Sequence, residues 1–287
     1  MWLTTLAGKI ERAAFLDPVA SGVTAGVDAV LPTGKVKDAL HGRPLGHAAH
    51  PLMVAAPIGM WAGALLLDLT AGSSGRSAAK RLVGAGVLLV APTAAAGLAD
   101  WSELGEFQRP KRVGLVHATA NAATTAVYAA SWLARRRGDH GRGRNLALLG
   151  VAGLGVGGYL GGHLSYSQGV GVNRNADEDP KQPREWTDAV SDAEVAEGRL
   201  QRVEVSGRPV VITRRDGVVH AMGAVCSHYG APLDEGEVDA DGCLVCPWHD
   251  SRFRLRDGSV ARGPATSPQT SYETRLQGDR LQLRARR

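Results

Sequence analysis

The chain has 287 residues, a net charge of +5 at neutral pH, 44% hydrophobic residues and three cysteines. So few cysteines exclude a scaffold that is stapled by several disulfides. The basic residues gather beside long apolar stretches and no nucleic-acid-binding motif accompanies them, so we expect anionic lipid headgroups, and no nucleic acid, as their partners.

Residues 1–40 are expected to form an N-terminal leader. Its apolar residues are spaced so that a helix would lie flat on a membrane surface, with a flexible leader as the alternative. The stretch lacks the basic start, apolar core and small-residue cleavage site of a secretory signal peptide. The apolar positions are Trp2, Leu3, Leu6, Ile10, Ala14 and Phe15.

Four apolar stretches follow within residues 41–172, and each is close to the length that a helix needs to cross a bilayer. The fourth stretch carries glycine at every fourth position, a spacing that lets helix backbones approach closely in lipid. We therefore predict a bundle of four transmembrane helices, with a water-soluble, alanine-rich bundle as the alternative. The stretches are residues 51–69, 82–99, 113–133 and 146–162.

Ionisable residues stand at those ends of the four stretches that an alternating path would bring to one membrane face. Such residues in a membrane span mark a functional site by default. Neutral histidines on facing helices can ligate haem iron or line a quinol or proton site, and interhelical hydrogen bonding is the structural alternative. The group contains His47, His50, Asp100, His117 and His163, of which His50, His117 and His163 are the candidate site residues.

Residues 173–186 are polar, charged and proline-bearing, which predicts a tether between two domains. Residues 187–287 contain four hairpin turn signals between short apolar segments, which is typical of a small antiparallel β domain. The predicted fold is thus α plus all-β in two domains. The turn signals are Asp216-Gly217, Asp241-Gly242, Asp257-Gly258 and Gly278-Asp279.

A Cys-x-His pair and a Cys-x-x-His pair lie within the predicted β domain. Two thiolates and two imidazoles are the ligands of a Rieske [2Fe–2S] cluster, in which one iron takes both sulfurs and the other takes both nitrogens. Structural zinc is the alternative, although zinc ligands usually come as like pairs within one hairpin. The mixed pairs favour the cluster, and the residues are Cys226, His228, Cys246 and His249.

The surrounding sequence resembles a Rieske ferredoxin domain over residues 187–287. The resemblance rests on Cys226-Ser-His-Tyr-Gly-Ala-Pro-Leu233, Cys246-Pro-Trp-His-Asp-Ser-Arg-Phe253 and Gly263-Pro264. It implies the same four ligands to a [2Fe–2S] cluster, with Pro264 in a loop that shields it. One position departs from the family pattern, because most members have glycine where this chain has Asp250.

Two positions near the second pair bear on the reduction potential. High-potential Rieske proteins of quinol-oxidising complexes carry a serine and a tyrosine there, whose hydroxyls can donate to the cluster sulfurs. This chain has Ser251 but Phe253, so one donor is missing, and we expect a lower potential of the ferredoxin kind. The third cysteine, Cys243, is expected to be a small strand residue.

The first half also carries a resemblance. His41-Gly-Arg-Pro-Leu-Gly-His-Ala-Ala-His50, the following apolar stretch up to Asp68, and Gly161-Gly-His-Leu-Ser-Tyr-Ser-Gln-Gly-Val170 resemble a bacterial family of four-span membrane domains of unknown function. This similarity covers about residues 40–172. It implies membrane residence and names no activity.

Together these features predict a membrane-anchored Rieske protein that carries single electrons between a redox partner protein, or a quinol, and a membrane or soluble acceptor. We expect an electron-transfer protein or oxidoreductase component in preference to a complete enzyme. A redox-sensing regulatory membrane protein and a ferredoxin component for a separate oxygenase are the alternatives.

The expected location is the bacterial plasma membrane, crossed several times. Basic residues in the two loops between paired spans favour an external Rieske domain under the positive-inside rule, but the opposite face holds comparable basic residues. Cluster insertion takes place in the cytoplasm, and the lack of a stabilising disulfide suits a reducing compartment. We therefore expect the Rieske domain on the cytoplasmic side.

Overall fold

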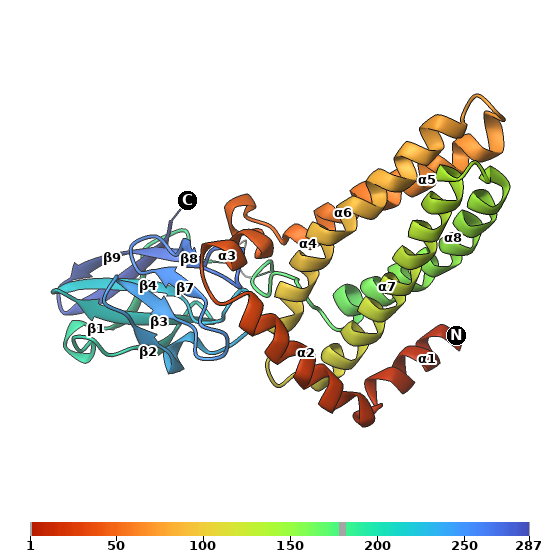
Figure 1. Ribbon diagram of the computed structural model, residues 1–287. Coiled ribbons are helices and arrows are strands. Elements are labelled where there is room, and N and C mark those ends of the chain that lie inside the picture. Colours follow the sequence, from red (N-terminus) through yellow and green to blue (C-terminus); the bar gives the residue numbers. More distant parts are fainter. Residues whose placement is uncertain (1, 178–181, 287) are drawn as a thin grey trace. The chain divides into compact units, whose positions relative to one another are not determined.

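The computed structural model describes residues 2–177 and 182–286 and divides into two compact units (Figure 1). The first contains the residues up to Thr33 together with Ala48–Val170 and is helical. The second combines Gly34–His47 with Gly171–Arg287 and holds every described strand. A helical N-terminal region followed by an antiparallel β domain is therefore confirmed, and a short N-terminal segment joins the β unit.

The helical unit is built from two long antiparallel hairpins, α5 with α6 and α7 with α8, which Figure 1 shows as pairs of helices lying side by side. Two shorter helices precede them, and a further short helix leads into α5. The bounds are α1 (Trp2–Glu11), α2 (Asp17–Val30), α4 (Ala49–Met53), α5 (Ala55–Thr70), α6 (Arg76–Ser102), α7 (Gln108–Arg136) and α8 (His140–Gly162).

Three helical stretches are long and apolar enough to cross a bilayer, namely Ala49–Thr70, Arg76–Ser102 and His140–Ser167. The helix α7 is as long but does not meet this criterion, because threonines, Asn121 and His117 dilute its apolar residues. Many apolar side chains on the three stretches point outward; Leu88, for example, is 76% exposed. Outward apolar surface of this extent is typical of contact with lipid or another apolar partner.

Two helices of the expected leader, α1 and α2, pack on the long helices of the first unit, whereas its last residues, from Gly34 on, belong to the β unit. The Arg112 guanidinium on α7 donates two hydrogen bonds of 2.6 Å to the carboxylate of Asp17 on α2. The carboxylate of Glu11, at the end of α1, lies 2.7 Å from the Nε2 atom of His163. Both contacts tie the N-terminal helices to the hairpins.

The two halves of the helical unit repeat one another. Each of three residues in α4 and α5 has a counterpart in α7 that stands 67 residues later, and the counterparts meet in space. The pairs are His50 with His117, Trp61 with Tyr128, and Asp68 with Arg135. The rings of Trp61 and Tyr128 stack with centroids 3.9 Å apart and planes inclined by 8°. Arg135 donates two hydrogen bonds of 2.7 and 2.5 Å to the Asp68 carboxylate.

The second helix of each hairpin repeats as well. The Trp61 indole lies against Gly86 of α6, and the Tyr128 ring lies against Gly150 of α8. A Cβ atom at either glycine would overlap the ring, so the close approach requires glycine. The two hairpins thus use matching contacts along the line where they meet, which is typical of an internal duplication.

The β unit contains two antiparallel sheets. The larger has the order β1-β10-β9-β4-β3-β2 and the smaller the order β5-β6-β7-β8. The bounds are β1 (Thr187–Ser191), β2 (Gln201–Val205), β3 (Arg208–Arg215), β4 (Val218–Gly223), β5 (Glu237–Val238), β6 (Cys243–Val245), β7 (Arg252–Arg254), β8 (Val260–Arg262), β9 (Ser271–Gln277) and β10 (Arg280–Ala285).

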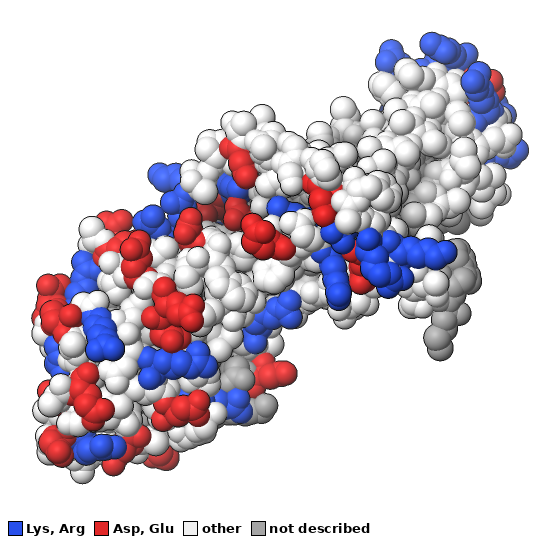
Figure 2. Space-filling view, turned by 90° about the horizontal axis from the view of Figure 1, so that it is seen from below, with Lys and Arg blue, Asp and Glu red and all other residues white. Residues whose placement is uncertain are grey.

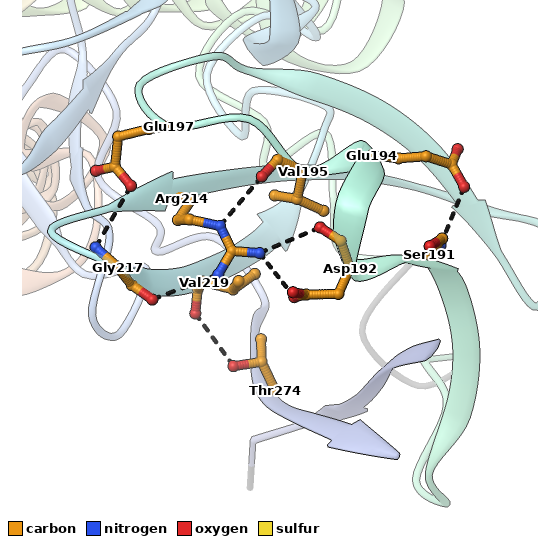
Figure 3. A network of polar contacts seen from close by, with 9 residues as sticks. All are labelled: Ser191, Asp192, Glu194, Val195, Glu197, Arg214, Gly217, Val219 and Thr274. Atoms are coloured by element: carbon orange, nitrogen blue, oxygen red, sulfur yellow. Dashed lines mark hydrogen bonds and ion pairs between the residues drawn. The ribbon is translucent and has the colours of Figure 1, made fainter. Parts of the chain in front are cut away.

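The turn signals in the sequence mark real turns. Asp216 and Gly217 both have positive φ, 52° and 74°, and close the hairpin between β3 and β4. The 3-10 turn Asp192–Glu194 is clamped to this hairpin by Arg214, which donates to Asp192 Oδ1 at 2.7 Å and to the Val195 carbonyl at 3.1 Å (Figure 3). This polar network fixes one end of the larger sheet.

The expected tether is partly bound to the β unit. The Arg174 amide donates to the Ser227 carbonyl at 3.0 Å, and the Asn175 side chain donates to the Val225 carbonyl at 2.8 Å. On the far side, Tyr272 donates its hydroxyl hydrogen bond to Gln182. Residues 178–181, the acidic part of the expected tether, lie outside the described residues.

Candidate iron–sulfur site

Two loops present the predicted ligands at the same end of the β unit. The loop after β4 carries Cys226 and His228, and the loop between β6 and β7 carries Cys246 and His249. Backbone hydrogen bonds close each loop, from Cys226 to the Ala231 carbonyl at 2.8 Å and from Asp250 to the Cys246 carbonyl at 3.1 Å. The structure therefore brings together all four residues that the spacing singled out.

The two sulfurs form a buried pair. Cys226 and Cys246 are each 1% exposed and form no disulfide. Their mutual hydrogen bond lowers the pKa of Cys246 to about 7, and it raises the pKa of Cys226 together with burial. Backbone N–H groups of Trp248 and His249 also favour the Cys246 thiolate. A sulfur that is cradled by N–H groups is suited to carry the negative charge of a cluster.

The two imidazoles form a second pair. The ring centroids of His228 and His249 lie 5.0 Å apart, and the planes are inclined by 84°. Burial, followed by Coulombic interactions with His249, His41 and Arg174, lowers the pKa of His228 to about 3. The ring is therefore neutral at physiological pH, which is the form that binds metal. Its Nδ1 atom is buried and has no hydrogen-bond partner among the described residues, which is expected of an atom that binds a metal.

The four side chains are arranged as like pairs, with the two thiols hydrogen-bonded to each other and the two imidazoles in ring contact. A thiol pair and an imidazole pair, each able to serve one iron, are what a [2Fe–2S] cluster of the Rieske type requires.

The residues expected around the cluster lie beneath the two loops. Ser251 is fully buried, and its Oγ accepts the Ala265 N–H at 3.0 Å, directly after Pro264. Phe253 is fully buried in a core that also contains Cys226, Cys246 and Leu244. Because the Ser251 oxygen accepts from the backbone, its own proton is available for a sulfur acceptor, whereas Phe253 has none to offer.

We expect Ser251→Ala to lower the reduction potential and Phe253→Tyr to raise it. A hydrogen bond to a charged acceptor is worth about 1.5–3 kcal/mol, which for one electron corresponds to roughly 60–130 mV. A spectroelectrochemical titration of the purified protein measures the shift. Ser227→Ala is the matched control, because the Ser227 hydroxyl already donates to the Ser267 carbonyl at 2.7 Å. An unchanged potential in Ser251→Ala would contradict this role.

Asp250 occupies a backbone conformation that explains why glycine is usual there. Its φ is 54°, in the left-handed region, which aspartate tolerates better than most side chains. The carboxylate is exposed, and its charge acts to raise the pKa of Cys246. A negative charge at this position disfavours further negative charge on the cluster.

A segment from the N-terminal part of the chain covers the shielding loop, and no sequence motif pointed to it. The helix α3 (Lys35–His41) belongs to the β unit, and the Asp38 carboxylate accepts the Gly263 N–H at 2.9 Å. Arg43 pairs with the same carboxylate at 3.4 Å, and His41 is 2% exposed. Asp38 and Gly263 lie 225 residues apart in the chain, so no local pattern could predict the contact.

We expect Asp38→Ala to make the cluster labile. The Gly263 N–H would lose its acceptor, which costs about 1–3 kcal/mol in a buried place, and the loop that ends in Pro264 would open more often. The rate at which the visible absorption bleaches under a chelator in air measures this. Asp38→Asn keeps an acceptor oxygen and should bleach more slowly than Asp38→Ala. Equal rates in all three proteins would show that α3 does not hold the loop.

The candidate membrane histidines do not form one group in the structure. His50 and His117 meet, with ring centroids 6.4 Å apart. His163 instead contacts Glu11, and His47 falls in the β-containing unit. The prediction of a histidine site is thus narrowed to one pair.

Comparisons with known proteins agree with this division. Residues 185–273 match the family model described as Rieske [2Fe-2S] domain, and residues 46–174 match the one described as Predicted membrane protein (DUF2231). The ferredoxin of carbazole 1,9a-dioxygenase from Nocardioides aromaticivorans IC177 is a similar solved structure. Its sequence identity is 25% and its TM-score 0.34, over 35% of this chain and 98% of that one.

Among curated relatives, the ferredoxin subunit of the 3-phenylpropionate/cinnamic acid dioxygenase of Escherichia coli (strain K12) is 34% identical over 87 residues. This match covers 30% of this chain and 80% of the subunit. Mouse apoptosis-inducing factor 3 is 31% identical over 88 residues, which are 31% of this chain but only 14% of that protein. The chain therefore belongs to the Rieske [2Fe–2S] family through its β domain, which it joins to a domain of a predicted membrane-protein family.

Proposed function

We propose that this protein is a plasma-membrane Rieske protein of bacteria that carries one electron at a time between a redox partner protein and a second acceptor. The observation that carries the proposal is the buried thiol pair beside the imidazole pair at the end of the β unit. His249 is half-buried and its neighbour Trp248 is 47% exposed, so the imidazole side of the site reaches the protein surface. An electron can leave there by contact with a partner.

The site and the relatives support the class of partner that we propose. Ferredoxin components of dioxygenase systems are among the similar proteins. Phe253 removes a donor that would raise the potential, which favours a flavin-containing reductase or an oxygenase component over a quinol. The redox-sensing alternative would leave the cluster without such a partner.

We propose four membrane spans. Three of them are supported by their apolar composition, whereas α7 is not apolar enough to be identified as a span by composition alone. The hydroxyls of Thr119, Thr124 and Thr125 donate to carbonyls one turn earlier, at 2.8–2.9 Å, so the helix satisfies them itself. In the internal duplication, α7 is the counterpart of α5, and α5 lies in one of the apolar stretches that are long enough to span a membrane. This equivalence supports α7 as a span.

For the orientation we propose a cytoplasmic Rieske domain. Free cysteines and a cluster that is assembled in the cytoplasm support this side. Figure 2 shows an uncharged surface on the helical unit that ends in a group of Lys and Arg at the tip where the hairpin loops lie. Under the positive-inside rule these basic loops favour a cytoplasmic tip and therefore an external Rieske domain. Fusion of a fluorescent protein that matures only in the cytoplasm to the C-terminus decides between them, because fluorescence requires the proposed side.

The function is tested by reduction of the detergent-purified full-length protein. We expect NADH and the flavoprotein reductase of a dioxygenase system to bleach the cluster absorption quickly, and a short-chain quinol to bleach it slowly. Fast reduction of the cluster by the quinol, but not by the reductase, would instead assign the protein to quinol oxidation. A cluster that neither donor reduces would contradict the electron-carrier proposal.

A further inference from the structure

The pair His50 and His117 has the features of a built ligand site. The Nδ1 atom of His50 lies 3.0 Å from the Thr93 carbonyl on α6, and the Nδ1 atom of His117 lies 3.0 Å from the Gly157 carbonyl on α8. Each contact requires the proton on Nδ1, because a carbonyl can only accept. This leaves the lone pair of both histidines on Nε2, the tautomer of a metal-ligating imidazole whose other nitrogen is held by the protein.

Glycines seat both rings. A Cβ atom at Gly97 would lie 2.8 Å from the His50 ring, and one at Gly161 would lie 3.1 Å from the His117 ring. These glycines hold equivalent positions in α6 and α8, one turn after the carbonyls that fix Nδ1. The same seat is therefore built twice, once in each half of the duplicated unit.

The spacing of the rings suits one metal between them. Two imidazoles that bind a metal from opposite sides, with metal–nitrogen distances of about 2 Å, hold their ring centroids about 6 Å apart. The observed separation is 6.4 Å, with planes inclined by 79°. Asn121 donates to the Nε2 atom of His117 at 3.1 Å, and it also donates to the His117 carbonyl at 2.9 Å, a bond it would keep if a metal displaced the first.

Two imidazoles alone do not complete the shell of a bare metal ion. Among the described residues, no third His, Cys, Asp or Glu joins the pair in a group that could hold one. A haem supplies four in-plane nitrogens of its own and needs only axial ligands from the protein. Facing helices of a bundle commonly provide such ligands.

We propose that His50 and His117 are the two axial ligands of a haem held between the halves of the helical unit. The site is separate from the iron–sulfur cluster and does not depend on the function proposed for it. It adds a second one-electron centre to the chain, with iron in a six-coordinate, two-imidazole environment.

The test is titration of hemin into the detergent-purified full-length protein, followed by visible and electron paramagnetic resonance spectra. We expect one haem per chain with a low-spin, six-coordinate spectrum. His50→Ala and His117→Ala should each lose that spectrum, whereas His117→Met should keep six-coordination with shifted bands, since methionine is also an axial ligand. Gly97→Ala should bind hemin about 10–100-fold more weakly, because it displaces the His50 ring.

Two control variants distinguish axial ligation by this pair from binding elsewhere on the chain. His163→Ala removes a histidine of the same unit that contacts Glu11, and it should bind hemin like the unchanged protein. Cys246→Ser should lose the cluster and keep the haem spectrum. The proposal is overturned if the unchanged protein binds no hemin, if His50→Ala and His117→Ala both keep the low-spin spectrum, or if His163→Ala loses it equally. Quinone-analogue binding that His117→Ala abolishes, without any hemin binding, would assign the pair to a quinol site instead.

Discussion

Cys246→Ser is expected to abolish the iron–sulfur cluster, its visible absorption and all electron transfer through it. The Cys246 sulfur is buried against Cys226, and their hydrogen bond, followed by the backbone N–H groups of Trp248 and His249, lowers the pKa of the Cys246 thiol to about 7. A serine oxygen at this place is a harder and far more basic ligand, and it remains protonated. The iron and acid-labile sulfide contents of the purified protein measure the effect, with two of each per chain expected before the change.

Cys243→Ser is the matched control for this experiment. Cys243 is also a buried cysteine, 4% exposed, but it lies in β6 and burial raises the pKa of its thiol. We expect the control to keep its full iron content. His228→Ala should behave like Cys246→Ser. A protein that lost iron on Cys243→Ser and kept it on Cys246→Ser would require a different ligand set.

The second large effect is expected in the helical unit. Asp68→Ala should destabilise it by about 3–5 kcal/mol, the cost of leaving a buried charge without its partner. The Arg135 side chain is fully buried, and it is held by Asp68 in a two-bond ion pair. Thermal unfolding of the detergent-purified protein, followed by the helical circular dichroism signal, measures the loss.

The double variant Asp68→Ala, Arg135→Met removes both charges and should recover much of the stability, because no unpaired charge remains. Glu106→Ala, at an exposed position between α6 and α7, should change stability by no more than about 0.5 kcal/mol. If the double variant were as unstable as Asp68→Ala, packing around Arg135, and not its charge, would be the cause.

The parts of the site that the sequence predicts are those set by local geometry. Each ligand pair lies within one short loop, and Asp-Gly turns fix the neighbouring hairpins, so spacing alone identifies Cys226, His228, Cys246 and His249. The covering contact from Asp38 joins residues far apart in the chain, and the Glu11 partner of His163 lies in a helix that precedes the bundle. Only the folded structure brings such residues together.

The internal duplication had a faint signal in the sequence. His50 and His117 are identical residues 67 positions apart. The other two pairs with this spacing are not identical, because Trp61 pairs with Tyr128 and the acidic Asp68 pairs with the basic Arg135. Complementary pairs conserve contact and not identity, so a search for identical residues passes over them. The threonines, Asn121 and His117 of α7 explain why this helix falls short of an apolar span while α5 lies in one.

The central claim is tested most directly by an optical redox titration of the detergent-purified full-length protein together with its metal content. We predict two irons and two sulfides per chain, and broad visible bands that bleach with the addition of one electron to the cluster. One zinc per chain without visible absorption in anaerobically prepared protein would contradict the cluster, and with it the role in electron transfer.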